Sequence, residues 1–187
     1  MPNTSTQTDI NTNEAKVTET PSTTQNTTNT GPKGMQIPRL YTKTGEDPLE
    51  QIEYEIRSSI IKNSDGSIVK EIKNVEVPKA WSQVATDILA QKYFRKAGVP
   101  QFNADGSPKL NADGSPVLGS ETSAKQTVHR LAGTWRYWGE KYGYFASPED
   151  AQVFYDEIAI MLLRQMAAPN SPQWFNTGLH WAYGINS

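Results

Sequence analysis

The first patterned stretch of the chain alternates hydrophobic and polar positions. Ile52, Tyr54 and Ile56 are each followed by a charged residue, the period of two expected of a strand with one buried face. The cluster Asn63-Ser64-Asp65-Gly66 predicts a turn, and a second run rich in β-branched residues follows it and ends at Pro78. We expect a β-hairpin packed on another element, because a two-stranded sheet is marginal by itself.

A helical period replaces this alternation after Ser82. Apolar side chains recur at steps of three and four, and Gly98 with Pro100 supplies a stop signal. The expected apolar face comprises Val84, Ala85, Ile88, Leu89 and Tyr93. The basic residues expected in the last turn are Lys92, Arg95 and Lys96. Cations there complement the helix dipole, which we favour over the alternative, a phosphate-binding end.

A second helix is expected from Thr122 or Ser123 to Tyr142, with a glycine C-cap at position 143. Its apolar stripe comprises Val128, Leu131, Trp135, Trp138 and Tyr142. Two glycines inside it, Gly133 and Gly139, each cost ~1 kcal/mol relative to Ala, so we expect a neighbour to pack closely there. The chain holds two histidines. His129 has no second ligand nearby, so we interpret it as a surface or satisfied core residue.

A third helix begins at Ser147-Pro148-Glu149-Asp150, which combines an N-cap, a proline in the first turn and acidic residues near the positive end of the dipole. We expect Pro169 to end it. Its broad buried face would comprise Phe154, Ile158, Met161, Leu162 and Met166. Asp156 and Glu157 are adjacent, so their side chains point in different directions. We interpret them as solvated charges that compensate the dipole, and not as a catalytic carboxylate pair.

A six-residue turn sequence, Asn-Ala-Asp-Gly-Ser-Pro, occurs twice, at residues 103–108 and 111–116. Asp-Gly and Ser-Pro are both turn signals. Calcium binding is the alternative, but the alternating carboxylates and the distal glutamate of an EF-hand are missing. We therefore expect a duplicated surface turn or short hairpin.

Composition narrows the possible functions. The chain has no cysteine, so it carries no disulfide, thiolate nucleophile or Cys-ligated metal of its own. Its net charge of −2 gives no basic footprint for nucleic acid. No apolar run approaches the ~18 residues of a membrane span, and the N-terminus has no apolar core typical of a secretory signal. We expect a cytoplasmic protein that binds neither nucleic acid nor a membrane.

The N-terminal stretch is rich in threonine and asparagine and poor in apolar side chains. Such a segment buries too little surface to offset the ordering of its backbone, which costs ~1–2 kcal/mol per residue. We therefore expect residues 1–44 to be a disordered tail, with phosphorylation or partner binding as the alternative, and residues 45–187 to form one folded domain.

The stretch after the third helix, residues 170–178, reads NSPQWFNTG. Its short polar residues can form a tight cap that presents N–H groups and the Ser171 hydroxyl to an anion, while Trp174 and Phe175 anchor it in the core. An ordinary helix cap is the alternative. From the residues alone, the ordinary cap is the more frequent case.

Two long motifs then identify a family. Residues 77–100, VPKAWSQVATDILAQKYFRKAGVP, closely resemble the N-terminal region of adenosylcobalamin-dependent, or class II, ribonucleotide reductases. Residues 168–179, APNSPQWFNTGL, resemble that family's Asn-Ser-Pro signature. The resemblance covers about residues 45 to 185 in the correct order. The Thr-rich tail and the duplicated turn are not expected from the family.

The resemblance implies a mainly α fold with a small β-hairpin, a helical N-terminal lobe that precedes a ten-stranded α/β barrel. It implies a ribonucleoside-diphosphate reductase that makes deoxyribonucleotides for DNA synthesis, with triphosphates as an open alternative. In the family, adenosylcobalamin generates a thiyl radical on a barrel cysteine, and two further cysteines supply reducing equivalents. The signature serine contacts the substrate nucleotide, which carries over to Ser171.

The sequence ends at Ser187, before any such cysteine. We therefore expect no catalytic residue and no cobalamin site in it, and no activity without a barrel-bearing partner. Fragment, split gene and separate subunit are all open. A different interpretation is a freestanding helical interaction or regulatory module derived from the same lobe.

Overall fold

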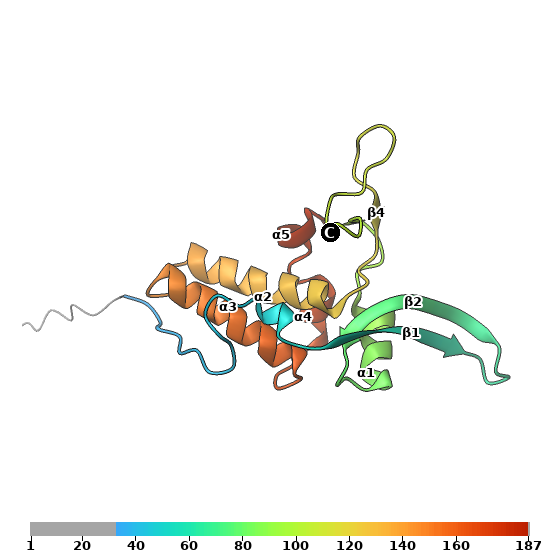
Figure 1. Ribbon diagram of the computed structural model, residues 1–187, viewed down its shortest axis with the longest axis horizontal. Helices are drawn as coiled ribbons and strands as arrows, with labels where there is room; N and C mark the ends of the chain where they lie inside the picture. The colour runs from blue at the N-terminus through green and yellow to red at the C-terminus, as the bar shows by residue number, and fades with distance from the viewer. Residues whose placement is uncertain (1–32, 187) are drawn as a thin grey trace, which may run out of the picture. The chain divides into compact units, whose positions relative to one another are not determined.

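The computed structural model describes residues 33–186, and its first large element is the expected hairpin (Figure 1). Strand β1 (Tyr54–Lys62) pairs antiparallel with β2 (Ile68–Pro78). The register of this pairing shifts between Arg57 and Ser59. Both side chains bond to the helical segment that follows β2: Arg57 donates to the Thr86 hydroxyl, and Ser59 accepts from the Gln91 amide. The alternation predicted Ile56 on the buried face of the strand, which was wrong: Ile56 is 63% exposed, whereas Ser59 is fully buried.

The helix expected after Ser82 is shorter than predicted. Helix α1 (Gln83–Ile88) continues as a π-helix, η2 (Leu89–Tyr93), and the backbone N–H of Phe94 closes it by donating to the carbonyl of Leu89. The basic residues 95 and 96 therefore lie beyond the helix, not in its last turn. The expected apolar face is also only partly buried, since Val84 is 67% exposed.

Helices α2 (Ala124–Lys141) and α3 (Pro148–Leu163) lie side by side and form most of the core (Figure 1). Both begin as predicted: Ser123 and Gln126 form a capping box on α2, and the Ser147 side chain accepts from the backbone N–H of Asp150 on α3. The buried cluster also takes in β2, α1 and η2, through residues such as Val75, Val77, Trp81, Leu89, Val128, Leu131, Tyr155 and Leu163.

The close approach expected at the helix glycines is confirmed. A Cβ built on Gly133 would lie 2.1 Å from the Trp181 ring, and one on Gly139 would lie 2.3 Å from the Phe145 ring. The C-terminal end of the predicted apolar stripe is not buried, however: Trp138 is 45% and Tyr142 62% exposed. Both glycines therefore serve packing, which offsets their low helix propensity.

Helix α3 ends earlier than predicted, at Leu163 and not near Pro169. Gln165 adopts a left-handed backbone with φ +55, which an α-helix cannot continue. Met166, expected on the buried face, is consequently 47% exposed.

Residues 35–50 form an N-terminal arm along α3, which includes the short 3-10 helix η1 (Pro48–Glu50). The interpretation of Asp156 and Glu157 as solvated charges was wrong, because both are buried. Asp156 accepts from Arg39 at 2.7 Å, and Glu157 accepts from the backbone and side chain of Thr42. Their side chains do point to different partners, as expected. The part of the expected tail up to residue 44 thus bonds to α3, and residues 1–32 lie outside the described residues.

The duplicated sequence folds as expected, into two successive exposed turns next to the small sheet of β3 (Val99–Pro100) and β4 (Leu118–Gly119). In each turn the aspartate accepts from the serine two residues later, as at Asp105 and Asp113. The turn at Asn63 has the same bonds. This local bonding lowers the pKa of each aspartate, mainly through the serine hydroxyl.

The chain then forms two short helices, α4 (Ser171–Asn176) and α5 (Leu179–Tyr183), which pack against α2 (Figure 1). The mainly helical fold with a β-hairpin is therefore confirmed for residues 33–186, and the barrel stays a prediction. No helix in the described part of the chain is long and apolar enough to cross a membrane.

Candidate substrate-contact site

Ser171 is the first residue of α4 and lies at the surface. Its Oγ is 2.9 Å from the phenolic oxygen of Tyr93, the last residue of η2. The two residues are 78 positions apart in the sequence, so only the fold brings them together. The expected cap is formed differently from the prediction, because Asn170 is the N-cap but its side chain makes no capping bond.

Aromatic rings hold this pair of hydroxyls in place. Tyr93 stacks on Trp174 with 5.8 Å between ring centroids, and the Phe175 ring meets Tyr93 edge-on at 5.1 Å. The indole N–H of Trp174 donates to the carbonyl of Pro169 at 2.9 Å. Trp174 packs on the core as predicted, but Phe175 is 43% exposed and does not anchor α4 there.

The Arg130 side chain, on α2, donates hydrogen bonds to the backbone of α4 and of the residue that follows it. The Arg130 side chain is fully buried, and its Nη1 donates to the carbonyl of Thr177 at 2.8 Å. Its Nη2 donates to the carbonyls of Trp174 at 2.7 Å and Tyr93 at 3.3 Å. One guanidinium on α2 therefore fixes both α4 and the end of η2, the two segments that carry the hydroxyl pair.

The charge of Arg130 is balanced by Glu121, which is also buried. Arg130 Nε donates to Glu121 Oε1 at 2.8 Å. The same carboxylate accepts from the backbone N–H of Arg95 and from the hydroxyl of Tyr183, both at 2.8 Å. Burial, followed by the negative charge of Glu121, raises the pKa of Tyr183. Glu121 thus links α5 and the segment after η2 to the same centre.

Gly178 allows this centre to close. It adopts φ +87, and a Cβ at this position would lie 2.2 Å from the Arg130 carbonyl oxygen. Any larger residue would push the connection between α4 and α5 away from α2. The glycine in the Asn-Ser-Pro segment therefore has a packing role.

Sequence reasoning placed Ser171 in this region but missed Tyr93, Arg130 and Glu121. Tyr93 was assigned to an apolar face, although its hydroxyl reaches Ser171. Arg130 and Glu121 had no local pattern, since they lie nine residues apart and only one of them is in a helix. No local signal marked Arg130 either, because the residues one turn away on α2, such as Thr127 and Gly133, do not belong to the predicted apolar stripe.

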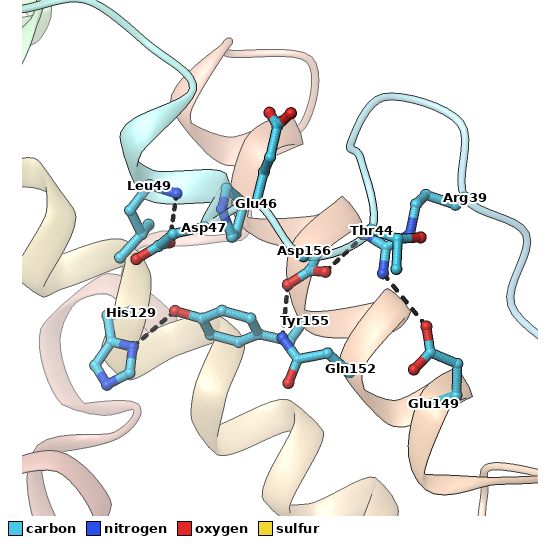
Figure 2. Close-up of a pocket in the computed structure, with 12 residues that line it drawn as sticks. Arg39, Thr44, Glu46, Asp47, Leu49, His129, Glu149, Gln152, Tyr155 and Asp156 are labelled. Carbon is cyan, nitrogen blue, oxygen red and sulfur yellow. Dashed lines mark hydrogen bonds and ion pairs between the residues drawn. The ribbon is translucent and has the colours of Figure 1, made fainter.

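A cleft of about 600 Å³ lies between the N-terminal arm and helices α2 and α3 (Figure 2). Its polar groups mostly bond one another: Arg39 pairs with Asp156, and His129 Nδ1 lies 2.7 Å from the Tyr155 hydroxyl. Burial of the imidazole lowers the pKa of His129. Among residues 33–186 no group of His, Cys, Asp and Glu could hold a metal ion. The polar groups of this cleft are therefore mostly satisfied by one another inside the fold, whereas the Ser171 hydroxyl lies at the surface with Tyr93 as its partner.

Comparison with known proteins agrees with the family that the motifs indicate. The family model described as class II vitamin B12-dependent ribonucleotide reductase matches residues 55–165, which span the hairpin and helices α1 to α3 and stop before Ser171. Proteins named vitamin B12-dependent ribonucleotide reductase are similar beyond that range. The one from Bradyrhizobium diazoefficiens is 53% identical over 168 residues, 81% of this chain and 13% of its own length.

Two further relatives have the same name. The protein from Agrobacterium fabrum is 50% identical over 168 residues, and that from Streptomyces clavuligerus is 40% identical over 148 residues. The two matches cover 81% and 78% of this chain, but only 13% and 14% of the length of the respective relatives. It therefore spans about an eighth of the length of the reductases it matches. The chain belongs to the class II vitamin B12-dependent ribonucleotide reductase family.

Proposed function

We propose that this chain forms the N-terminal lobe of an adenosylcobalamin-dependent ribonucleotide reductase, and that the Ser171 hydroxyl contacts the ribonucleotide substrate. The observation that carries the second part is the exposed Ser171 hydroxyl on a helix whose carbonyls are held by a buried guanidinium. A surface hydroxyl on so firmly held a support is suited to recognition, because little order remains to be lost on binding.

The chemistry of the whole reductase is a proposal from the family. A thiyl radical abstracts the ribose 3′ hydrogen, and a cysteine pair supplies the two reducing electrons. Because a thiyl radical requires a thiol and this chain has no cysteine, we place these steps in the barrel-bearing part of the reductase. Adenosylcobalamin, when bound there, supplies the radical. We assign none of the described residues to it. We also propose a cytoplasmic location.

We propose the barrel-bearing part as the partner of this lobe. Large apolar side chains lie exposed on α2 and α4: Tyr137 is 43%, Trp138 45% and Phe175 43% exposed. Tyr137 and Trp138 line one pocket together with the end of α4. Trp174 and Trp181 are half-buried nearby. Aromatic residues are enriched at protein interfaces relative to the rest of a protein surface. Docking there would place Ser171 at the edge of the joint surface.

A fused reductase tests the proposal. The full 187-residue chain replaces the matching N-terminal region of the Bradyrhizobium reductase, and deoxyribonucleotide formation is measured with adenosylcobalamin and a dithiol reductant. We expect a fusion that is active, while the chain alone and the truncated Bradyrhizobium protein are not. A fusion that is folded but inactive, together with an isolated chain that is monomeric and unfolds cooperatively, would favour a freestanding interaction module.

A further inference from the structure

We infer that Tyr93 is a positioning residue for the reductase: it orients the Ser171 hydroxyl toward substrate. This inference rests on the proposed contact between Ser171 and the ribonucleotide. Tyr93 need not touch the substrate, and it acts through the 2.9 Å hydrogen bond between the two hydroxyls.

Either hydroxyl can donate in this bond, and one of the two directions suits recognition. A serine hydroxyl has one donor hydrogen and two acceptor lone pairs, and a phenol can donate to one of them. When Tyr93 donates, the Ser171 hydrogen is left to point at an oxygen of the nucleotide. Successive hydrogen bonds also polarise one another, so the serine becomes a better donor than an isolated hydroxyl. Without the phenol, the exposed serine would turn freely among its rotamers.

The π-helix explains how Tyr93 reaches this position. In η2 the closing bond joins residue 94 to residue 89, so the turn holds one residue more than an α-helical turn. Because each residue of an α-helix rotates the chain by about 100°, an α-helical path would turn the Tyr93 side chain away from α4. Single π-turns within α-helices are frequent at functional sites. Here the irregularity has a definite consequence, which is the contact with Ser171.

Tyr93 and Ser171 also share an anchor. Arg130 donates to the carbonyl of Tyr93 itself and to that of Trp174, on the helix that begins at Ser171. The Trp174 ring also stacks on the Tyr93 ring. The two segments that carry the hydroxyl pair are therefore attached to α2 through the same guanidinium.

A double-mutant cycle in the fused reductase tests the inference. Tyr93→Phe removes only the phenolic oxygen and keeps the ring stacking. We expect this variant to raise KM for the ribonucleotide about five-fold, the effect of losing one hydrogen bond, with kcat and Tm close to wild type. Ser171→Ala should raise KM by a similar factor. The double variant should raise it little further, because the two hydroxyls act as one unit.

Tyr142→Phe is the matched control, since Tyr142 is an exposed tyrosine 62% accessible at the end of α2. It should change neither KM nor Tm. A Tyr93→Phe variant with unchanged KM, in an active fusion where Ser171→Ala does raise KM, would overturn the positioning role alone. Fully additive effects of the two substitutions would also overturn it. An inactive fusion would overturn the proposed function and this inference together.

Discussion

The side chains of Arg130 and Glu121 form an ion pair that is wholly buried, with 2.8 Å between Nε and Oε1. Removing two charges from water is costly, and their attraction offsets this cost only when the remaining hydrogen-bonding groups are satisfied. Here they are satisfied by three backbone carbonyls on one side and by a backbone N–H and a phenol on the other. The pair joins α2, η2, α4 and α5 at one point.

Arg130→Met should therefore be strongly destabilising. It leaves Glu121 buried without its counter-charge and frees the carbonyls of Trp174 and Thr177, so we expect a loss of about 3–5 kcal/mol in the free energy of unfolding, measured by urea denaturation. The control is Lys79→Met, which breaks an ion pair with Glu53 whose side chains are 63% and 82% exposed. That variant should change the free energy by less than about 1 kcal/mol. Equal losses in the two variants would contradict a special role for the buried pair.

Gly133→Ala should destabilise the chain, although alanine is the better helix former. Replacing glycine inside a helix normally gains ~1 kcal/mol, but here the new methyl group would overlap the Trp181 ring, and such overpacking costs ~1–3 kcal/mol. We expect a lower Tm by thermal denaturation. In a Trp181→Ala background the obstacle is gone, so the same substitution should raise Tm. A lowered Tm in both backgrounds would argue against the ring contact.

The arm should loosen in acid. Burial raises the pKa of Glu157, but hydrogen bonds from the Thr42 side chain and the backbone of residues 40–42 outweigh it and hold the pKa below its usual value of 4.5. Because the folded-state pKa is lowered, the bonds stabilise the fold fully above pH ~4.5 and this contribution is lost as the pH falls through the folded-state pKa. Glu157→Gln should flatten the dependence of unfolding free energy on pH in that range.

Proteolysis gives a direct readout of the same contact. Lys43, exposed in the arm, should be cleaved by trypsin faster in Glu157→Gln than in the native chain at neutral pH. Asp105→Asn, in an exposed turn, is the control and should leave cleavage at Lys43 unchanged. Equal cleavage in the native and Glu157→Gln chains would show that Glu157 does not hold the arm.

Ser171→Ala should weaken substrate binding in the fused reductase without loss of stability. The residue is exposed and its substitution removes one hydrogen bond to the substrate, so we expect a cost of ~1 kcal/mol in substrate affinity, or about five-fold in Kd. Equilibrium binding of the ribonucleotide measures it, with unfolding of the same variant as the check on stability. An unchanged affinity would count against the substrate contact.

The sequence by itself determined the elements whose signals are local. The hairpin turn at Asn63, the caps at Ser123 and Ser147, and the duplicated turns all depend on residues within four positions of one another, and all formed as predicted. The family motifs at residues 77–100 and 168–179 could also be recognised from the sequence alone. Their meaning for function came from resemblance, and the family itself is now shown by the comparisons.

The tertiary structure decided which polar groups are buried and which distant residues meet. Asp156 and Glu157 read as ordinary surface acids, yet the arm from residues 39–42 covers them. Tyr93 read as a core residue, yet a π-turn directs its hydroxyl to Ser171. Burial of a charge becomes favourable only when partners from other segments satisfy it, and those partners lie 9 to 117 positions away along the chain. No periodicity within one segment records a distance of that kind.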